Sequence, residues 1–386
     1  MHAYGVKLLS FFALVCIQTV VALTFKLSQH DAHYSYAPSS AQTTAEVIKL
    51  AISGALLTRV VHAELPADDD VGSPKSHAVL AVRVWARFRH DVTLHLAVSL
   101  GGLASLYSFN NQLAFMVFRL ADAASVTLVK SASTAVSAGL LWLLLSRPVS
   151  QHQLVCVALQ SLGLFVAQYD ACKHAAVLPV HVYLLLLLSL LITSLSGVAN
   201  EKLLKGETAH MHVQNICLYL YGIALNLAIF FVTERQPFFH GYSLAAWSVI
   251  ACQALLGIVV TFVLKYADMV VRCLASSCAV SALYAINILF LGFEFNPVYF
   301  AGAVTVFLAT YLYFNVTADR ECKSEATLEV VKLQSAEVAQ PSGSIPIVAQ
   351  RRILEGCMQL PTSSGVLLLF ALLAFVLYAK SGPREV

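Results

Sequence analysis

The sequence predicts an all-α polytopic membrane protein with ten transmembrane helices arranged as two inverted five-helix repeats. Composition is the first observation. Of the 386 residues, 59% are hydrophobic and 12% are charged, and the mean hydropathy is +0.75. Soluble domains carry about 25% charged residues, so this composition excludes a soluble protein. The formal net charge of +3 gives no indication of nucleic-acid binding.

The lengths of the apolar runs give the individual spans. A bilayer core about 30 Å thick needs about 20 apolar residues per helix. We interpret the first run as a retained span, because no small-residue cleavage site of a signal peptide follows it cleanly. The predicted spans are residues 8–27, 41–63, 92–117, 121–145, 150–169, 177–199, 214–233, 243–265, 269–293 and 297–316.

An eleventh apolar run, residues 365–379, is only about 15 residues long. This extra C-terminal hydrophobic helix could be a short span, a tail anchor or an interfacial segment. The chain then divides into a ten-span domain (1–317), a flexible cytosolic tail (318–362) and a short hydrophobic segment (363–386).

The distribution of Lys and Arg predicts the orientation. These residues gather at the ends of the even-numbered spans, in the loops that follow them, and in the tail after span ten. The loops after odd-numbered spans hold only Lys26, Arg119, Lys173 and Arg235. Because cytoplasmic loops are enriched in Lys and Arg, the N-terminus and the even-numbered loops are predicted to be cytosolic. We expect Glu64–Lys75 to be a solvated cytosolic loop.

A repeated motif predicts the inverted repeat. Arg119-Leu120-Ala121-Asp122 recurs as Lys265-Tyr266-Ala267-Asp268, each time between two apolar runs. The first copy lies at a lumenal connection and the second at a cytosolic one, so the two halves have opposite orientations. Inverted repeats are common in secondary transporters, whose substrate site lies near the midplane between the repeats.

Two charged residues of the second predicted span, Glu46 and Lys49, lie three residues apart and therefore on one helix face. Pairing lowers the cost of placing both in a membrane. One interpretation is a structural ion pair. The other is that Lys49 holds a phosphate while Glu46 orients it.

The third predicted span ends with Tyr107, Asn110, Asn111 and Gln112. Carboxamides can hydrogen-bond both edges of a base or a ribose, and a tyrosine can stack on the base. The alternative is that these side chains form hydrogen bonds between helices.

Two further cations, Lys130 and Arg272, follow the two copies of the repeated motif. Lys130 lies deep in the fourth span, where a cation invites an anionic ligand. The guanidinium of Arg272 suits bidentate contact with phosphate, although this residue could instead sit just cytosolic of span nine. Ser276, one turn later, could line a pore or allow close packing.

Enzyme signatures are missing from the sequence. We find no Ser/His/Asp or Cys/His nucleophile set, no H-E-x-x-H and no P-loop, and the nine cysteines include no C-x-x-C. The chain is therefore predicted not to be an enzyme, to hold no metal, and to need no cofactor. A secondary carrier for a phosphorylated anion fits best. A multi-spanning transferase or a non-transporting scaffold would be the rivals from other classes.

At these residues the sequence resembles the nucleotide-sugar transporters of the CMP-sialic acid/UDP-galactose/UDP-N-acetylglucosamine group. T-T-A-E-V-I-K-L (43–50) resembles the family's second-span motif. Two later stretches resemble G-V-x-x-E-K-x-L-K…N-I-x-x-Y-L-x-G-I and K-Y-T-D-x-x-x-K, namely 197–223 and 265–272. The resemblance runs from about residue 40 to 316 and implies a drug/metabolite-transporter-type fold with ten spans.

The resemblance has two departures. The family usually has Q-N-N in span three, where this chain has Asn110-Asn111-Gln112. Family members also carry a substrate lysine in span four, and counting from Asp122 that position is Ser133. The nearest lysine, Lys130, lies one turn earlier and would be its substitute.

The resemblance implies a multi-pass Golgi antiporter, with the ER membrane as the other location. It would import a pyrimidine nucleotide sugar, UDP-galactose or UDP-N-acetylglucosamine, in exchange for the nucleoside monophosphate. A carrier of the same fold for CMP-sialic acid, GDP-mannose or another phosphorylated metabolite is the alternative. The oligomeric state stays open, a homodimer included.

Overall fold

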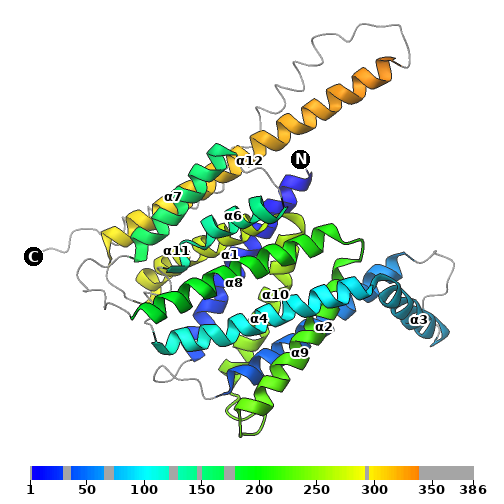
Figure 1. Ribbon diagram of the computed structural model, residues 1–386, viewed down its shortest axis with the longest axis vertical. Coiled ribbons are helices and arrows are strands. Elements are labelled where there is room, and N and C mark those ends of the chain that lie inside the picture. Colours follow the sequence, from blue (N-terminus) through cyan, green and yellow to red (C-terminus); the bar gives the residue numbers. More distant parts are fainter. Residues whose placement is uncertain are drawn as a thin grey trace, which may run out of the picture.

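The fold is helical throughout the part of the chain that the structure describes. The computed structural model describes residues 2–28, 36–64, 74–120, 129–145, 150–168, 179–291 and 295–338, and within these ranges there is no strand. This confirms the all-α class. The helices (Figure 1) are α1 (His2–Ser28), α2 (Pro38–Ala63), α3 (Pro74–Asp91), α4 (Leu94–Leu120), α6 (Ser133–Leu145), α7 (Gln151–Gln168), α8 (Val180–Gly206), α9 (Met211–Thr233), α10 (Leu244–Tyr266), α11 (Met269–Leu291) and α12 (Pro297–Val338).

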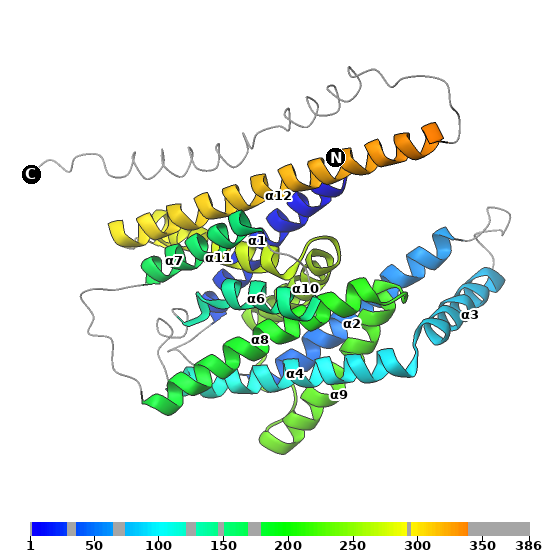
Figure 2. The same ribbon diagram turned by 45° about the horizontal axis from the view of Figure 1, so that its top comes forward.

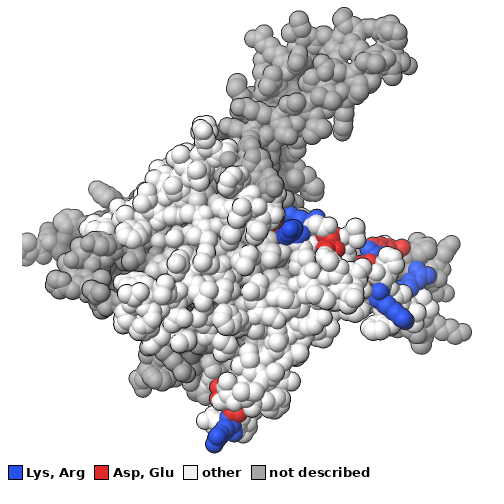
Figure 3. All heavy atoms as spheres, in the orientation of Figure 1, with Lys and Arg blue, Asp and Glu red and all other residues white. Residues whose placement is uncertain are grey.

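Six of these helices are long and apolar enough to cross a membrane: α1, α8, α9, α10, α11 and α12. A seventh span results if the bent pair α3–α4 is counted as one, and α6 and α7 are shorter apolar helices. In Figure 3, Lys, Arg, Asp and Glu gather at the end of the molecule where α3 lies and at the far end of α9, with an uncharged belt between them. The chain is a polytopic membrane protein.

The described helices follow the predicted apolar runs closely, except in three parts of the sequence. Residues 121–128 of the fourth run lie outside the described residues, so only its second half is seen, as α6. Helix α12 continues through 318–338, the first part of the predicted tail. Residues 339–386, with the eleventh apolar run, also lie outside the described residues.

Helix α3 is not predicted from the sequence. The expected loop Glu64–Lys75 contains the first two residues of α3, and no element is predicted for residues 76–91. Arg83, Arg87 and Arg89 keep this segment below the hydrophobicity of a span, so a search for apolar runs does not find it. The axes of α3 and α4 meet at 85°.

Proline, serine and glycine set the helix boundaries. Pro38 occupies the first turn of α2, and Pro179 precedes α8; both remove an N–H that would have no helical partner there. The hydroxyl of Ser243 accepts a hydrogen bond from the backbone N–H of Ala246 and caps α10. Gly241, with φ 74°, makes the turn just before it, in a conformation that favours glycine.

The helices pack in definite pairs. Helix α1 packs against α10 and α11, while α4 packs against α8 and α9. Helix α2 packs against α9 and α10, and α6 lies against α8, α7 and α11. Helices α7 and α12 run side by side in both ribbon views (Figures 1 and 2). The largest group of buried apolar side chains comes from α1, α6, α7, α8, α10, α11 and α12, with Met211 from the start of α9.

Small residues bring α7 and α12 into close contact. A Cβ added at Gly302 would lie 2.5 Å from the backbone nitrogen of Ala167, and one at Gly163 would lie 2.9 Å from Cβ of Thr305. Membrane helices use small residues in this way because close backbone packing replaces the hydrophobic driving force.

We expect Gly302→Ala to destabilise the protein by about 1–3 kcal/mol, because the new methyl group would overlap backbone atoms of α7. Thermal unfolding of the purified protein in detergent measures the change. Gly139→Ala on α6 is the matched control, since nothing lies within 4 Å of its added Cβ. Equal unfolding temperatures for the two variants would contradict the close contact.

Candidate functional site

The predicted ion pair of α2 forms inside the helical bundle. Nζ of Lys49 donates to Oε1 of Glu46 at 2.5 Å, and the two side chains are only 12% and 10% exposed. One helical turn places both residues on the same face, as the sequence predicts. In a region of low dielectric, this pairing stabilises both charges.

Glycines on two neighbouring helices make room for this pair. A Cβ at Gly222 of α9 would lie 3.2 Å from Cδ of Glu46, and one at Gly257 of α10 would lie 2.6 Å from Cδ of Lys49. Nζ of Lys49 also lies 4.7 Å from the ring centroid of Tyr219, a cation–π distance. The two charges therefore sit between α9 and α10.

The surroundings of Lys49 include buried polar atoms without partners among the described residues. The hydroxyls of Tyr219 and Ser53 make no hydrogen bond of standard geometry there, although Ser53 and Thr261 lie within interaction range of the Tyr219 hydroxyl. Buried polar groups are normally hydrogen-bonded, so unpaired ones mark a place for water or ligand. Sequence reasoning does not single out either side chain, although Tyr219 lies in the motif of residues 215–223.

Tyr107 connects α4 to α8. Its hydroxyl accepts a hydrogen bond from Nδ2 of Asn200 at 3.2 Å and donates to the carbonyl oxygen of Ser196 at 3.5 Å. The same side chain lies within electrostatic reach of Arg272 and of Glu46. Tyr107 thus stands between the charged pair of α2 and the cation of α11.

Arg272 lies in the first turn of α11 and is half-buried. Its Nη1 would lie 3.2 Å from a Cβ added at Gly197 of α8, and it contacts Sδ of Met269 at 3.7 Å. Gly197 therefore leaves space mainly for the end of the Met269 side chain, and the guanidinium lies beside it. Arg272 thus lies against α8, and its role toward a phosphate stays a prediction.

Ser276 follows Arg272 by one turn and connects α11 to α1. Its hydroxyl donates to the carbonyl oxygen of Arg272 at 3.0 Å and accepts from Nε2 of Gln18 at 3.0 Å. Oε1 of Gln18 is buried and has no hydrogen-bond partner among the described residues. Gln18 is thus a further candidate that the sequence does not reveal, because a single glutamine in an apolar run carries no pattern.

The carboxamides of α4 have different surroundings. Oδ1 of Asn110 accepts hydrogen bonds from Ser189 at 3.3 Å and from Thr193 at 3.1 Å, both on α8. Asn110 therefore forms hydrogen bonds between helices, which is the alternative to substrate binding that the sequence leaves open for it. Asn111 and Gln112 follow on the same helix and are half-buried.

The start of α6 carries Lys130 and Ser133. Lys130 lies in the short stretch before α6, and its side chain is exposed. Ser133 is half-buried and lies within interaction range of the Cys273 thiol, next to Arg272. The thiol of Cys273 also donates to Ser137 at 3.6 Å. Of the two positions, Ser133 is the one that faces α11.

Lys265 has a contact that the sequence does not predict. Its Nζ donates to the carbonyl oxygen of Leu204 in the last turn of α8, while Nζ of Lys205 donates to the carbonyl oxygen of Ala267, which ends α10. Lys265 of α10 therefore caps the C-terminus of α8, and Lys205 of α8 caps the C-terminus of α10. Cations are favourable there because the helix dipole is negative at that end.

Two carboxylates complete this contact at the N-terminus of α11. Glu201 is fully buried; its Oε2 accepts from the backbone N–H of Met269 at 2.7 Å, and its Oε1 accepts from Lys205 at 2.8 Å. Oδ1 of Asp268 accepts from the backbone N–H of Val271 at 2.8 Å. The motifs of residues 197–205 and 265–268 thus meet at one end of the bundle. We call this group of Glu201, Lys205, Lys265 and Asp268 the lysine clasp.

We expect Lys265→Ala to lower the free energy of unfolding by about 0.3–1 kcal/mol, the value of a cation at a helix C-terminus. The apparent affinity for a nucleotide sugar should stay unchanged, because Lys265 is occupied with a carbonyl of α8. Thermal unfolding and transport kinetics of the same preparation measure both quantities. Lys202→Ala, at an exposed position of the same turn of α8, is the control. A rise in KM without loss of stability would assign Lys265 to the substrate.

The part of the chain that the structure describes contains no group of three His, Cys, Asp or Glu side chains that could hold a metal ion.

Comparison with known proteins identifies the family. The family model of the nucleotide-sugar transporters matches residues 2–314. The chain is 24% identical over 320 residues to CMP-sialic acid transporter 2 of Oryza sativa subsp. indica, covering 81% of this chain and 85% of that protein. It is 28% identical over 247 residues to the UDP-galactose translocator of Mus musculus, covering 61% and 62%.

The fold has a counterpart among solved structures. A crystal structure of a protein 16% identical to this chain matches it with a TM-score of 0.53, covering 79% of this chain and 95% of that one. At this identity the likeness concerns the fold alone. The sequence match, however, extends over most of the chain. The protein belongs to the nucleotide-sugar transporter family.

Proposed function

We propose that this protein is a Golgi antiporter that imports a pyrimidine nucleotide sugar in exchange for the corresponding nucleoside monophosphate. UDP-galactose and UDP-N-acetylglucosamine are the favoured substrates, and UMP is the exchange partner. The observation that carries the proposal is the position of Tyr107 of α4, which lies within electrostatic reach of Arg272 on α11 and of Glu46, the ion-pair partner of Lys49 on α2. Buried cations and aromatic rings in one region suit a pyrophosphate attached to a base.

The packing of the helices supports ten spans in two inverted repeats. Exchanging the first five predicted spans (α1, α2, α4, α6, α7) with the last five (α8 to α12) maps the most extensive contacts onto one another. The pair α1–α10 becomes α4–α8, α1–α11 becomes α6–α8, and α2–α10 becomes α4–α9. The pairs α2–α9, α6–α11 and α7–α12 each map onto themselves. Such a pattern is what a two-fold axis in the membrane plane produces.

Within this site we assign the phosphates to Lys49 and Arg272, which come from different repeats. Glu46 holds Lys49 in place, and Tyr107, Asn111 and Gln112 are the candidates for base and ribose. Lys130 ranks after the two inner cations because its side chain is exposed.

Four other predicted residues have supporting roles in this proposal. Ser133 and Ser276 line the surroundings of Arg272, Asn110 holds α4 against α8, and Lys265 belongs to the lysine clasp.

The charges also explain why transport should be an exchange. An empty cationic site in low dielectric resists reorientation, because desolvated charges without a counter-ion are costly. A bound phosphate removes that cost in either direction. The two repeats would then rock about the filled site, so that the nucleoside monophosphate leaves as the nucleotide sugar enters.

Proteoliposomes containing the purified protein test the proposal. Preloading with UMP should accelerate the uptake of radiolabelled UDP-galactose or UDP-N-acetylglucosamine, whereas preloading with GMP should not. Protein-free liposomes are the blank. If UMP inside the vesicles leaves uptake of every UDP-sugar unchanged, the proposal fails.

A second candidate is exchange of CMP-sialic acid for CMP. It is favoured by the relatives named as CMP-sialic acid transporters, whose identity of 24% to 26% is close to that of the UDP-galactose translocators. A panel of nucleotide sugars, GDP-mannose included, competing for uptake in the same vesicles ranks the two candidates.

A further inference from the structure

Helix α3 lies across the direction of the bundle. It meets α4 at 85°, so if α4 crosses the membrane, α3 runs close to parallel with the membrane surface. Figure 2 shows α3 at the end of the bundle, beside the last turns of α2 and the first turns of α4. Its loop follows the second predicted span and is therefore cytosolic by the distribution of Lys and Arg.

One face of α3 packs against α2, and the opposite face is exposed. One face packs Leu80, Val84 and Phe88 against Leu57 and Val61 of α2. The opposite face exposes large apolar side chains: Val79 is 45% exposed, Val82 67% and Trp85 63%. The helix carries four basic residues and one acidic residue. Basic helices with exposed Trp and Val are typical of segments that lie in the membrane interface.

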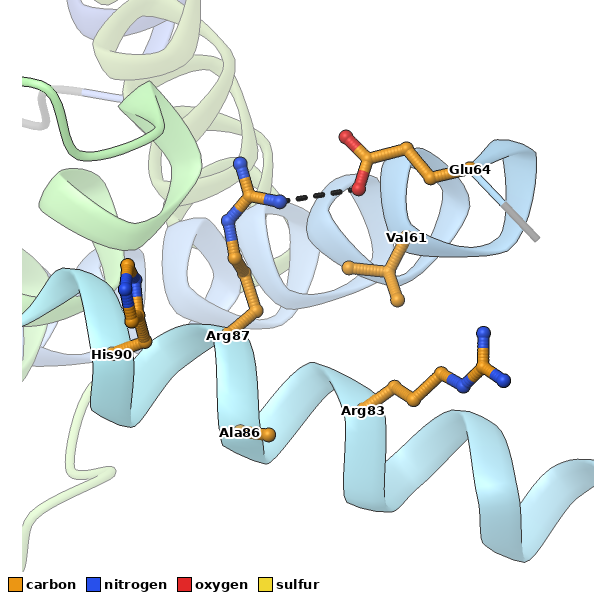
Figure 4. Close-up of a pocket in the computed structure, with 6 residues that line it drawn as sticks. All are labelled: Val61, Glu64, Arg83, Ala86, Arg87 and His90. Carbon is orange, nitrogen blue, oxygen red and sulfur yellow. Dashed lines mark hydrogen bonds and ion pairs between the residues drawn. The ribbon is translucent and has the colours of Figure 1, made fainter.

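A pocket of about 370 Å³ lies between α3 and the end of α2. This volume is within the range of small-molecule sites. Figure 4 shows Arg87 and His90 rising from α3 toward α2, with Arg83 on the same helix beside Val61. The lining residues are Val61, Glu64, Arg83, Ala86, Arg87 and His90.

An ion network fixes the walls of this pocket. Nη1 of Arg87 donates to Glu64 at 3.1 Å, and its Nε donates to Asp91 at 3.1 Å. Asp91 also accepts from the backbone N–H of His210 at the start of α9. Burial acts to raise the pKa of Asp91, but His90, His210 and Arg87 together hold it below its usual value. Asp91 is thus ionised at neutral pH and keeps Arg87 in place.

We propose that α3 is an interfacial helix and that its pocket binds the headgroup of an anionic phospholipid of the cytosolic leaflet. The exposed guanidinium of Arg83 contacts the phosphate, and the acyl chains lie along Val82 and Trp85. The cytosolic leaflet is the anionic one, and Lys and Arg near its surface are attracted to it. The site lies outside the Lys49–Arg272 region, so it can exist whichever nucleotide sugar is carried.

Fluorescence of Trp85 tests the position of the helix and the identity of the headgroup. Trp142→Phe with Trp247→Phe leaves Trp85 as the sole tryptophan, since the chain has three. The full-length variant is placed in vesicles that contain equal fractions of brominated phosphatidylserine or brominated phosphatidylcholine. Both lipids should quench Trp85, and phosphatidylserine should quench it more. Absence of quenching, or equal quenching by both lipids, overturns the proposal.

A charge-matched pair of variants locates the site on α3. Arg83→Gln removes a pocket residue, while Arg89→Gln removes an equal charge outside the pocket lining of the same helix. Arg83→Gln should weaken the apparent affinity for phosphatidylserine at least tenfold, because it removes the contact with the phosphate in addition to the diffuse attraction of one basic residue, which is worth about fivefold. Arg89→Gln should remove only the diffuse attraction, about fivefold or less. Equal losses would mean diffuse attraction rather than a site.

A comparison with inorganic phosphate shows whether the pocket binds a lipid headgroup or a soluble anion. Phosphatidylserine added to the detergent-solubilised protein should raise its unfolding temperature, and inorganic phosphate at the same concentration should not. If inorganic phosphate stabilises the protein equally, the pocket is a soluble-anion site and the lipid proposal is wrong.

Discussion

Arg272→Ala is expected to reduce nucleotide-sugar exchange roughly 10- to 100-fold, because a hydrogen bond to a charged group contributes about 1.5–3 kcal/mol. The guanidinium lies against Gly197 of α8 and within reach of Tyr107 of α4. The initial rate of UDP-sugar uptake into UMP-loaded proteoliposomes, normalised to folded protein, measures the loss. Arg272→Lys should recover part of the rate, since it keeps the charge but not the bidentate geometry.

Arg89→Ala provides the control for charge alone, because it removes one cation from the exposed surface of α3. Its transport rate should equal that of the unmodified protein. If Arg272 served only to pack α11 against α8, Arg272→Ala would lower the unfolding temperature while the rate per folded molecule stayed the same. That outcome would remove Arg272 from the substrate site.

Lys49→Met is expected to destabilise the protein by about 3–5 kcal/mol and to abolish exchange. The change leaves Glu46 as an unpaired charge in a side chain that is only 10% exposed, and removing one partner of a buried pair has this cost. The space beside Gly257 accepts the methionine, since its length is close to that of lysine. Thermal unfolding and uptake measured on one preparation give both numbers.

The double variant Glu46→Gln with Lys49→Met separates the two interpretations of the pair. It removes both charges, so most of the stability should return. Exchange should remain absent, because the phosphate still lacks its cation. Recovery of transport together with stability would show that the pair is structural, and the assignment of Lys49 to the substrate would have to be withdrawn.

Local patterns in the sequence predict the parts of this protein that depend on neighbouring residues. Apolar run lengths locate the helices, and helical periodicity places Glu46 beside Lys49. The amphipathic α3 escapes the same approach, because Arg83, Arg87 and Arg89 interrupt its apolar pattern. A test for a basic helix with one apolar face would have found it.

Contacts between helices that are far apart in the sequence cannot be predicted from such local patterns. Lys265 and Leu204 are 61 residues apart, and only the packing of α8 beside α10 shows that the lysine caps a carbonyl. Likewise, nothing in the sequence distinguishes Gly222 and Gly257 from other small residues. Only the structure shows that the side chains of Glu46 and Lys49 lie beside them. The repeated motif therefore draws attention to Lys265, but it does not reveal what this side chain contacts.

The lysine clasp has a consequence for how substrate first meets the protein. Lys205 and Lys265 are satisfied by backbone carbonyls, and the carboxylates of Glu201 and Asp268 offset their charges. The clasp itself therefore projects little net positive field, and the exposed cations at this end are those of α3 and Lys202. Long-range attraction of a nucleotide sugar here would depend on these exposed cations and should weaken with salt, because the screening length shortens from about 10 Å at 0.1 M to 3 Å at 1 M.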